Sequence, residues 1–325
     1  MFSLEKLQSM VFGYAVADAC GVPVEFNYRP LLKLNPVKNM REFGTWHQPV
    51  GTWSDDTSLT IATMESIARL RSIDYDDIMK NFSLWYFQSK FTANNETFDC
   101  GNTTSLALRN FANKTNPLNC GLADENSNGN GSLMRILPLA FYFYSLQGDL
   151  TDEAMNIIHN VSSLTHAHPR CLIACGIYSM IAVQLLKGLS LHDAIFSGID
   201  NAKNFYSNNP IFSQQLEFYS RLFDKNFADL PEYEIESSGY VVSTLEAVLW
   251  CLLNTDNYKY LVLKAVNLGG DTDTIAAIAG GLAGFYYGLN DIPKDWLVSL
   301  KNKSCLEKIT EDFFASMINL YSRQF

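Results

Sequence analysis

Hydrophobic residues recur every three or four positions along almost the whole chain, and no segment sustains a strict alternation of hydrophobic and polar residues. A spacing near 3.6 residues places hydrophobic side chains on one face of a helix, whereas strands alternate with a period of two. The pattern therefore predicts an all-α protein. We expect helices over residues 3–20, 55–71, 75–91, 103–113, 133–147, 151–164, 170–187, 191–206, 211–224, 240–253, 257–267, 273–287 and 306–322.

The segments between these helices are rich in Gly, Asn, Pro and Ser, and the longest cover residues 21–54, 92–102, 115–132 and 225–239. None is biased enough in composition to mark a domain border, and no repeat recurs at a fixed period of about 20 to 50 residues. We predict one domain over residues 1–325, an irregular multi-helix bundle that carries its function on loops.

Composition narrows the classes of protein and partner. Hydrophobic residues make up 47% of the 325 positions, enough for a large core, and the formal charge of -10 argues against a nucleic-acid partner. We see no stretch of about 18 to 20 uncharged apolar residues and no basic leader, so we expect neither a membrane span nor a secretory signal. Seven cysteines without disulfide-framework spacing favour the cytoplasm, and we expect a monomer.

Two acidic motifs each stand directly before a predicted helix. The first is GTWSDDT at residues 51–57, in which Ser54 is a plausible N-cap, and the second is GGDTDT at residues 269–274. Acidic residues in a first helical turn have a purely structural use, because each stabilises the helix by about 0.3 to 1 kcal/mol. The Ala- and Gly-rich helix after the second motif indicates more than capping, since small faces let neighbouring backbones approach closely.

If the two helix starts face each other, Asp55, Asp56, Asp271 and Asp273 bring four negative charges into one cleft. Their mutual repulsion raises their pKa values unless cations bind between them. Carboxylate and hydroxyl oxygens are hard ligands, which suit Mg²⁺, Mn²⁺ or Ca²⁺ rather than zinc. Such a set of acids can hold two ions about 3.5 to 4 Å apart.

Three further segments carry candidate chemistry. A small-residue helix ends at Gly21, and Glu25 follows just beyond it as a candidate functional acid. Asp18, within that helix, is expected to be a buried hydrogen-bond acceptor. Alternatively, Glu25 is a solvated loop carboxylate. Residues 99–104 and 128–135 each open a helix with glycines, which let backbone amides point at phosphate oxygens. The alternative for these two loops is a tight turn.

The segment THAHPRC, with Cys175 one helical turn later, superficially resembles a zinc site of two His and two Cys. We reject this reading, because Pro169 starts a helix that carries Cys171 and Cys175 on one face as small core residues. His166 and His168 are better placed at the rim of a cleft.

In this order, the motifs resemble those of the ADP-ribosylglycohydrolase family; they are ADACGVPVEF, GTWSDDT, DCGNTTSLAL, GNGSLMRILPLA, THAHP, GYVVSTLEAVLW and GGDTDTIAAIAGGLAG. The resemblance implies an all-α fold with two Mg²⁺ or Mn²⁺ ions in a cleft that binds ADP-ribose. It also implies hydrolysis of the N- or O-glycosidic bond that joins ADP-ribose to a protein side chain or small molecule.

The resemblance further implies roles for individual residues. Glu25 and Asp99 are implied to be the catalytic acids that transfer protons. At the position of Ser54 the family more often has threonine. The implied metal ligands are Ser54, Asp55, Asp56, Asp271, Asp273 and Thr274. The implied substrate-binding residues are Gly101, Asn102, Gly129, Asn130, Gly131, Ser132, Met134, His166 and Tyr240. Tyr240 is expected to stack on adenine, with a core aromatic role as the alternative.

Cleavage at the anomeric carbon of ribose develops oxocarbenium character and needs a water nucleophile and help for the leaving group. We expect the metals to supply charge stabilisation and Glu25 to be the primary proton handler. Two other functions stay open: an inactive ADP-ribose-binding or immunity-type protein that blocks an ADP-ribosylating partner, and a metal-dependent nucleotide phosphatase.

Overall fold

The computed structural model describes residues 2–321, with side chains as far as Ile318. Over this range the chain is helical and forms only isolated β-bridges, so the predicted all-α fold class is confirmed. The α-helices are α1 (Leu4–Gly21), α2 (Arg29–Leu34), α3 (Asp55–Leu70), α4 (Tyr75–Gln88), α5 (Asn102–Ala112), α6 (Leu137–Gln147), α7 (Asp152–Ser163), α8 (Pro169–Leu186), α9 (Leu191–Ser207), α10 (Pro210–Leu216), α11 (Val241–Leu253), α12 (Tyr258–Asn267), α13 (Thr272–Tyr287), α14 (Lys294–Ser299) and α15 (Lys303–Tyr321).

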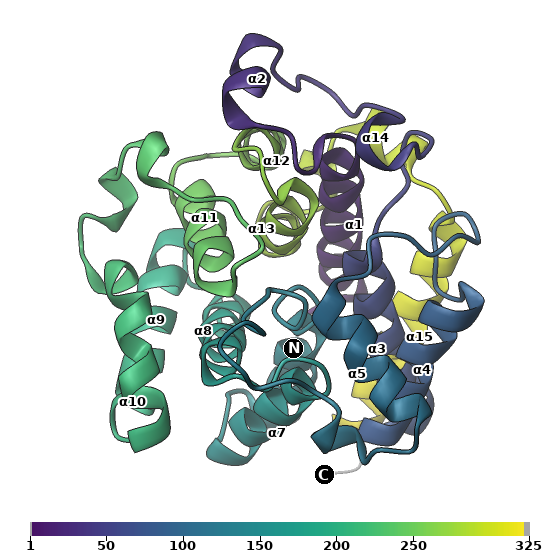
Figure 1. Cartoon of the computed structure of the whole chain (residues 1–325), viewed down its shortest axis with the longest axis vertical. Helices are drawn as coiled ribbons and strands as arrows, with labels where there is room; N and C mark the ends of the chain where they lie inside the picture. The colour runs from purple at the N-terminus through teal and green to yellow at the C-terminus, as the bar shows by residue number, and fades with distance from the viewer. Residues whose placement is uncertain (1, 322–325) are drawn as a thin grey trace.

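Helices α1 and α13 pack side by side at the centre of the molecule, although they come from opposite ends of the sequence (Figure 1). Glycines make this close approach possible. A Cβ atom on Gly284 would lie 2.3 Å from the carbonyl oxygen of Ser9, and one on Gly280 would lie 2.4 Å from the Cβ of Ala17. The small-residue run after residue 274 therefore serves the predicted purpose of bringing two helix ends together.

We expect Gly284→Ala to lower the free energy of unfolding by about 1 to 2 kcal/mol. The new methyl group must displace backbone, which costs about 1 to 3 kcal/mol, while alanine regains up to about 1 kcal/mol of helix propensity. Urea titration of purified variants measures the change. Gly101→Ala is the control, because no atom lies within 4 Å of its added Cβ; equal losses in both variants would contradict the packing argument.

Several predicted boundaries were wrong for local reasons. The helix expected over 133–147 begins only at Leu137, since Pro138 occupies its first turn and residues 131–135 form turns that face the site. The helix expected over 211–224 ends at Leu216 and continues as a 3₁₀-helix (Glu217–Phe223). Helices α2 and α14 have six residues each, too few for a periodic pattern to reveal.

Two helical stretches are long and apolar enough to span a membrane, contrary to our expectation from the sequence. They are the stretch Leu4–Val24, which contains α1, and α8. In the structure, 94% of the apolar stretch in Leu4–Val24 and 89% of the stretch in α8 are buried inside the protein. Both helices therefore have the environment of core helices.

Candidate active site

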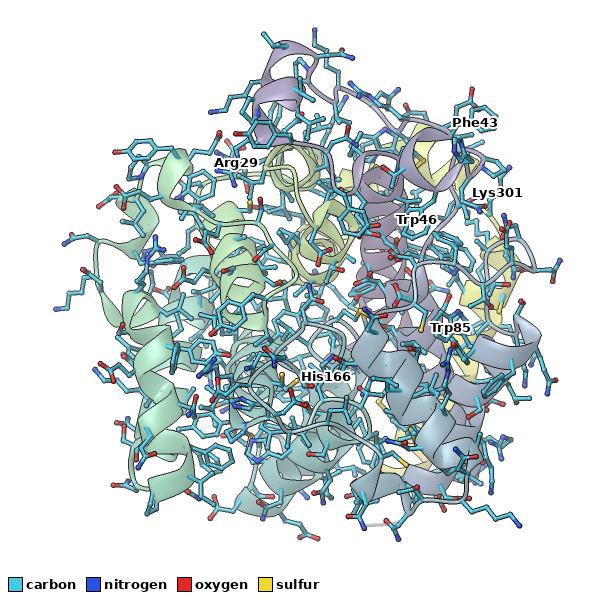
Figure 2. All side chains as sticks on the ribbon, viewed as in Figure 1. Arg29, Phe43, Trp46, Trp85, His166 and Lys301 are labelled. Atoms are coloured by element: carbon cyan, nitrogen blue, oxygen red, sulfur yellow. The ribbon has the colours of Figure 1, made fainter. Side chains whose placement is uncertain are left out.

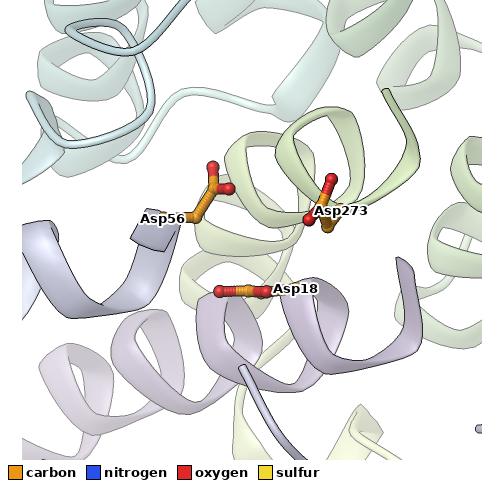
Figure 3. Close-up of side chains that lie close together, drawn as sticks. All are labelled: Asp18, Asp56 and Asp273. Carbon is orange, nitrogen blue, oxygen red and sulfur yellow. The ribbon is translucent and has the colours of Figure 1, made fainter. Parts of the chain in front are cut away.

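Three carboxylates from separate helices converge beside the central helix pair. Asp18 comes from α1, Asp56 from the first turn of α3, and Asp273 from the first turn of α13 (Figure 3). One oxygen atom of each lies within 4.8 Å of the others, and all three side chains are buried. The acidic motifs near the two ends of the chain thus meet, as predicted.

Asp18 holds the start of α3 in place. One of its oxygens accepts a hydrogen bond from the backbone N–H of Ser54 at 2.9 Å. The other accepts from the backbone N–H and the hydroxyl of Thr57, at 3.1 and 2.6 Å. These bonds satisfy donors that a helix start leaves exposed, and they agree with the predicted role of a buried acceptor.

A second group of carboxylates lies on the other side of Asp273. Oxygens of Glu25, Asp271 and Asp273 again lie within 4.8 Å of one another. Gly269 and Gly270, with φ of 73° and 72°, turn the chain so that Asp271 enters this group. The backbone N–H of Phe26 donates to the carbonyl of Gly270 at 2.7 Å, which fastens the Glu25 loop to the Asp271 loop.

Two oxygens in this acidic centre are buried without any hydrogen-bond partner among the described residues: Oδ1 of Asp271 and Oδ2 of Asp273. The other oxygen of each carboxylate accepts a hydrogen bond from an uncharged donor. Asn130 donates to Asp271 Oδ2 at 2.7 Å, and the backbone N–H of Thr274 donates to Asp273 Oδ1 at 2.9 Å. A buried anion without a partner is costly, and a bound hard cation removes that cost. The donor set therefore fits a divalent metal ion.

Burial and mutual repulsion raise the pKa values throughout the centre. Burial is the largest cause for Asp55, Asp56 and Asp273, followed by the charges of neighbouring acids. Burial, then Asp99 and Asp271, raise the pKa of Glu25 to about 10, while burial raises the pKa of Asp99 to about 6. Among the described residues, the largest causes of these shifts are burial, neighbouring acids and hydrogen bonds, and none is a basic side chain.

The hydroxyl residues of both motifs lie where the sequence predicts. Ser54 caps α3, and its hydroxyl donates to Asp56 Oδ2 at 3.0 Å. The hydroxyl of Thr274 donates to the same oxygen at 3.2 Å, which links the two motifs directly. Asp55, the other acid of the first motif, lines a cavity.

That cavity, of about 220 Å³, opens beside the carboxylates. Its lining combines the acidic centre with the two glycine-rich loops, and it includes most of the predicted substrate-binding residues. They are Gly101, Asn102, Gly129, Asn130, Gly131, Met134 and His166. The sequence reasoning did not assign Phe26, Thr103, Thr104 or Gly239, which also line it.

His166 lies against the second glycine-rich loop. Its Nδ1 is 2.8 Å from the hydroxyl of Thr165, which leaves the other edge of the ring toward the cavity. A Cβ atom on Gly131 would lie 2.8 Å from its Cε1, so the glycine is needed for this packing. Burial, together with Arg135, lowers the pKa of His166 to about 3, and the ring is neutral at physiological pH.

Three residues predicted to contact the substrate do not line the cavity. Ser132 is fully buried and accepts a hydrogen bond from the hydroxyl of Ser162 at 2.8 Å. His168 caps α8 through Nδ1 and contacts Glu125. Tyr240 directly follows Gly239 of the lining, and its hydroxyl accepts from Arg170 at 3.4 Å. Stacking of Tyr240 on adenine stays a prediction.

Two residues that fasten the site were missed from sequence. The indole N–H of Trp46 donates to the carboxylate of Glu25, and Figure 2 shows this side chain beside α1. Arg29 donates to the carbonyls of Leu268, Glu232 and Ile235 and so ties α2 to the loops around Asp271. Both lie in the segment 21–54, where no periodic pattern exists and only the tertiary contacts reveal a role.

The chain is similar over most of its length to proteins that are named as ADP-ribosyl hydrolases. The chain is 31% identical over 313 residues to the "ADP-ribosylarginine hydrolase Tri1" of Serratia proteamaculans, covering 96% of this chain and 80% of that protein. It is 30% identical over 296 residues to the "ADP-ribosyl-[dinitrogen reductase] glycohydrolase" of Rhodospirillum rubrum, covering 90% of this chain and 88% of the relative.

A solved structure described as "ADP-ribosylglycohydrolase-related protein complex" superimposes with a TM-score of 0.76 at 28% identity, covering 97% of this chain and 98% of the other. The family model described as ADP-ribosylglycohydrolase matches residues 2–323. This match spans nearly the whole sequence and includes both acidic motifs. The chain therefore belongs to the ADP-ribosylglycohydrolase family.

Proposed function

We propose that this chain is a metal-dependent hydrolase that releases ADP-ribose from arginine side chains of modified proteins. The observation that carries the proposal is the pair of buried, unpartnered oxygens of Asp271 and Asp273 beside Glu25, at the edge of a cavity lined by two glycine-rich loops. Arginine as the acceptor is supported by the similarity to the relative in Serratia proteamaculans that is named an ADP-ribosylarginine hydrolase.

Two Mg²⁺ or Mn²⁺ ions fit the carboxylate arrangement, with Ser54, Asp55, Asp56, Asp271, Asp273 and Thr274 as the residues that hold them. Asp273 belongs to both groups of three carboxylates, so its side chain would help to hold an ion at either group. When bound, such ions stabilise negative charge on ribose oxygens and lower the pKa of water.

The glycine-rich loops suit the pyrophosphate and distal ribose. Gly101 caps α5 without a side-chain hydrogen bond, so the amides of its first turn are available to phosphate oxygens. Gly129 and Gly131 present further backbone to the same cavity, with His166 beside them. A neutral His166 binds a ligand hydroxyl or phosphate without adding charge.

Glu25 and Asp99 are suited to opposite proton-transfer roles. Without bound metal, burial and the charges of Asp99 and Asp271 raise the pKa of Glu25 to about 10, so of the two acids Glu25 holds its proton to the higher pH and is the one suited to give it to the departing guanidine nitrogen. Asp99, with a pKa of about 6, is ionised at neutral pH and can accept a proton from the attacking water. Trp46 keeps the Glu25 carboxyl oriented during this exchange.

The test is incubation of an arginine-ADP-ribosylated protein with the enzyme and Mg²⁺, alongside serine-linked and O-acyl-linked substrates. Release of free ADP-ribose from the arginine-linked protein is expected. Inorganic phosphate without free ADP-ribose would instead indicate a nucleotide phosphatase. Tight binding without any release would indicate an ADP-ribose-binding protein of the immunity type.

We expect Glu25→Gln to lower kcat by about 10² to 10⁴, the usual contribution of a positioned proton donor. The amide keeps the hydrogen bond with Trp46 but cannot supply a proton. Single-turnover release of ADP-ribose measures the effect, and metal titration verifies that the acidic centre still binds ions. Glu234→Gln, at an exposed position, is the control. Full turnover by a metal-binding Glu25→Gln variant would remove Glu25 from the mechanism.

A further inference from the structure

Three aromatic side chains form a connected cluster beside Glu25, and one of them, Phe26, lines the cavity. The rings of Phe26 and Trp46 meet edge to face with centroids 6.3 Å apart, and those of Trp46 and Phe98 lie 5.7 Å apart. We call these three residues the aromatic wall. Phe98 directly precedes Asp99 and Phe26 directly follows Glu25, so the wall flanks both proton-transfer residues.

Phe26 is held in an unfavourable conformation that exposes its ring. Its φ is 59°, in the left-handed region that a bulky residue rarely adopts, and its side chain is 65% exposed although it lines the cavity. The backbone N–H bonds of Phe26 to Gly270 and of Asn27 to Val24 hold it there. Strain of this kind concentrates at functional positions, where the surrounding structure enforces it.

The rest of the aromatic wall is fixed from behind. Trp46 donates to Glu25, and the side chain of Gln48 joins the loops of Trp46 and Phe98, accepting from Asn94 at 2.6 Å and donating to Glu96 at 3.2 Å. These bonds fix the wall in place, and Phe26 is its most exposed ring. Phe26 lines the cavity next to Glu25, the proposed proton donor to the leaving group, so its exposed ring lies on the side of the leaving group.

We propose that the aromatic wall binds the guanidinium group of the acceptor and makes Phe26 a specificity-determining residue for cationic acceptors. This inference rests on the proposed function. A planar guanidinium stacks on aromatic faces and gains cation–π energy there, and an N-glycosylated guanidinium keeps its positive charge. A serine or O-acyl acceptor is neutral and gains nothing comparable. Phe26 therefore discriminates between acceptors that share the same ADP-ribosyl half.

Binding of the acceptor side can be measured apart from catalysis. Butylguanidinium and its neutral isostere butylurea are titrated into the enzyme with Mg²⁺ and ADP-ribose present. We expect butylguanidinium to bind about tenfold tighter than butylurea to the wild type, and the ratio to fall below about threefold in Phe26→Ala. Phe26→Trp should retain the preference. Phe43→Ala is the matched control, since Phe43 is also exposed, at 53%, with φ of 61°, but does not line the cavity.

Turnover provides the second readout. In Phe26→Ala, kcat/KM for the arginine-linked substrate should fall about tenfold, mainly through KM, and inhibition by free ADP-ribose should not change. An unaltered guanidinium-to-urea ratio in Phe26→Ala overturns the inference even if the wild type is active on arginine. A wild type that prefers butylguanidinium but releases no ADP-ribose from arginine overturns the proposed function and leaves the aromatic wall established as a guanidinium site.

Discussion

Asp273→Asn should abolish measurable release of ADP-ribose while making the metal-free protein more stable. Asparagine has the same shape and can still accept the hydrogen bond from the backbone N–H of Thr274. It removes the carboxylate that both acidic groups share. Loss of several kcal/mol of charge stabilisation by a metal corresponds to a fall in kcat of about 10³ or more.

The expected gain in stability arises in the metal-free protein, where the substitution removes a buried negative charge. Asp273 is buried, and the charges of Glu25, Asp99, Asp56 and Asp271 raise its pKa further. Neutralising it therefore relieves repulsion when no cation is bound. Single-turnover kinetics and thermal unfolding in the presence of a chelator measure the two effects. Asp200→Asn, the same charge change at an exposed position on α9, should alter neither. A variant that loses activity because it unfolds would show lower stability and contradict this account.

The acidic centre could be predicted from sequence because each half is a local motif. Ser54 caps α3 and Asp273 lies in the first turn of α13, and both helices have a clear hydrophobic period. The Gly- and Ala-rich face of α13 indicates close packing against another helix. Hard oxygen donors at two helix starts then specify the class of ligand. The sequence does not show that the two motifs meet. In the structure they are joined by the hydrogen bond from the hydroxyl of Thr274 to Asp56.

Other features of the site have no local signature. Trp46 lies in a 3₁₀ turn (Gly44–Trp46), and its role depends on contact with Glu25, some 20 residues earlier. The hydroxyl of Ser132 reads as a ligand in the motif GNGS, yet the turn at residues 131–135 points it into the core toward Ser162. Side-chain direction in a turn follows from backbone geometry, which the residue types alone do not determine.

Without bound metal, the free energy of unfolding of the protein should decrease as the pH rises. Folding raises the pKa values of Asp18 and Asp99 to about 6 and that of Glu25 to about 10. A carboxyl whose pKa is raised by folding stabilises the native state below its ordinary pKa, near 4, and that stability is lost as the pH rises through the raised value. The metal-free protein should therefore lose stability between about pH 4 and 6, and further toward alkaline pH as Glu25 ionises.

Added Mg²⁺ should stabilise the protein by about 3 kcal/mol per site at a concentration a hundredfold above Kd. The gain should be largest near pH 8 and small near pH 5, because protons compete with the metal for the same oxygens. Chemical unfolding with excess MgCl₂ or with a chelator, at both pH values, measures it. Asp273→Asn should lose most of the Mg²⁺ effect and Asp200→Asn should keep it. An equal Mg²⁺ effect at both pH values would place the bound ion outside the buried carboxylates, since exposed acids are already ionised at pH 5.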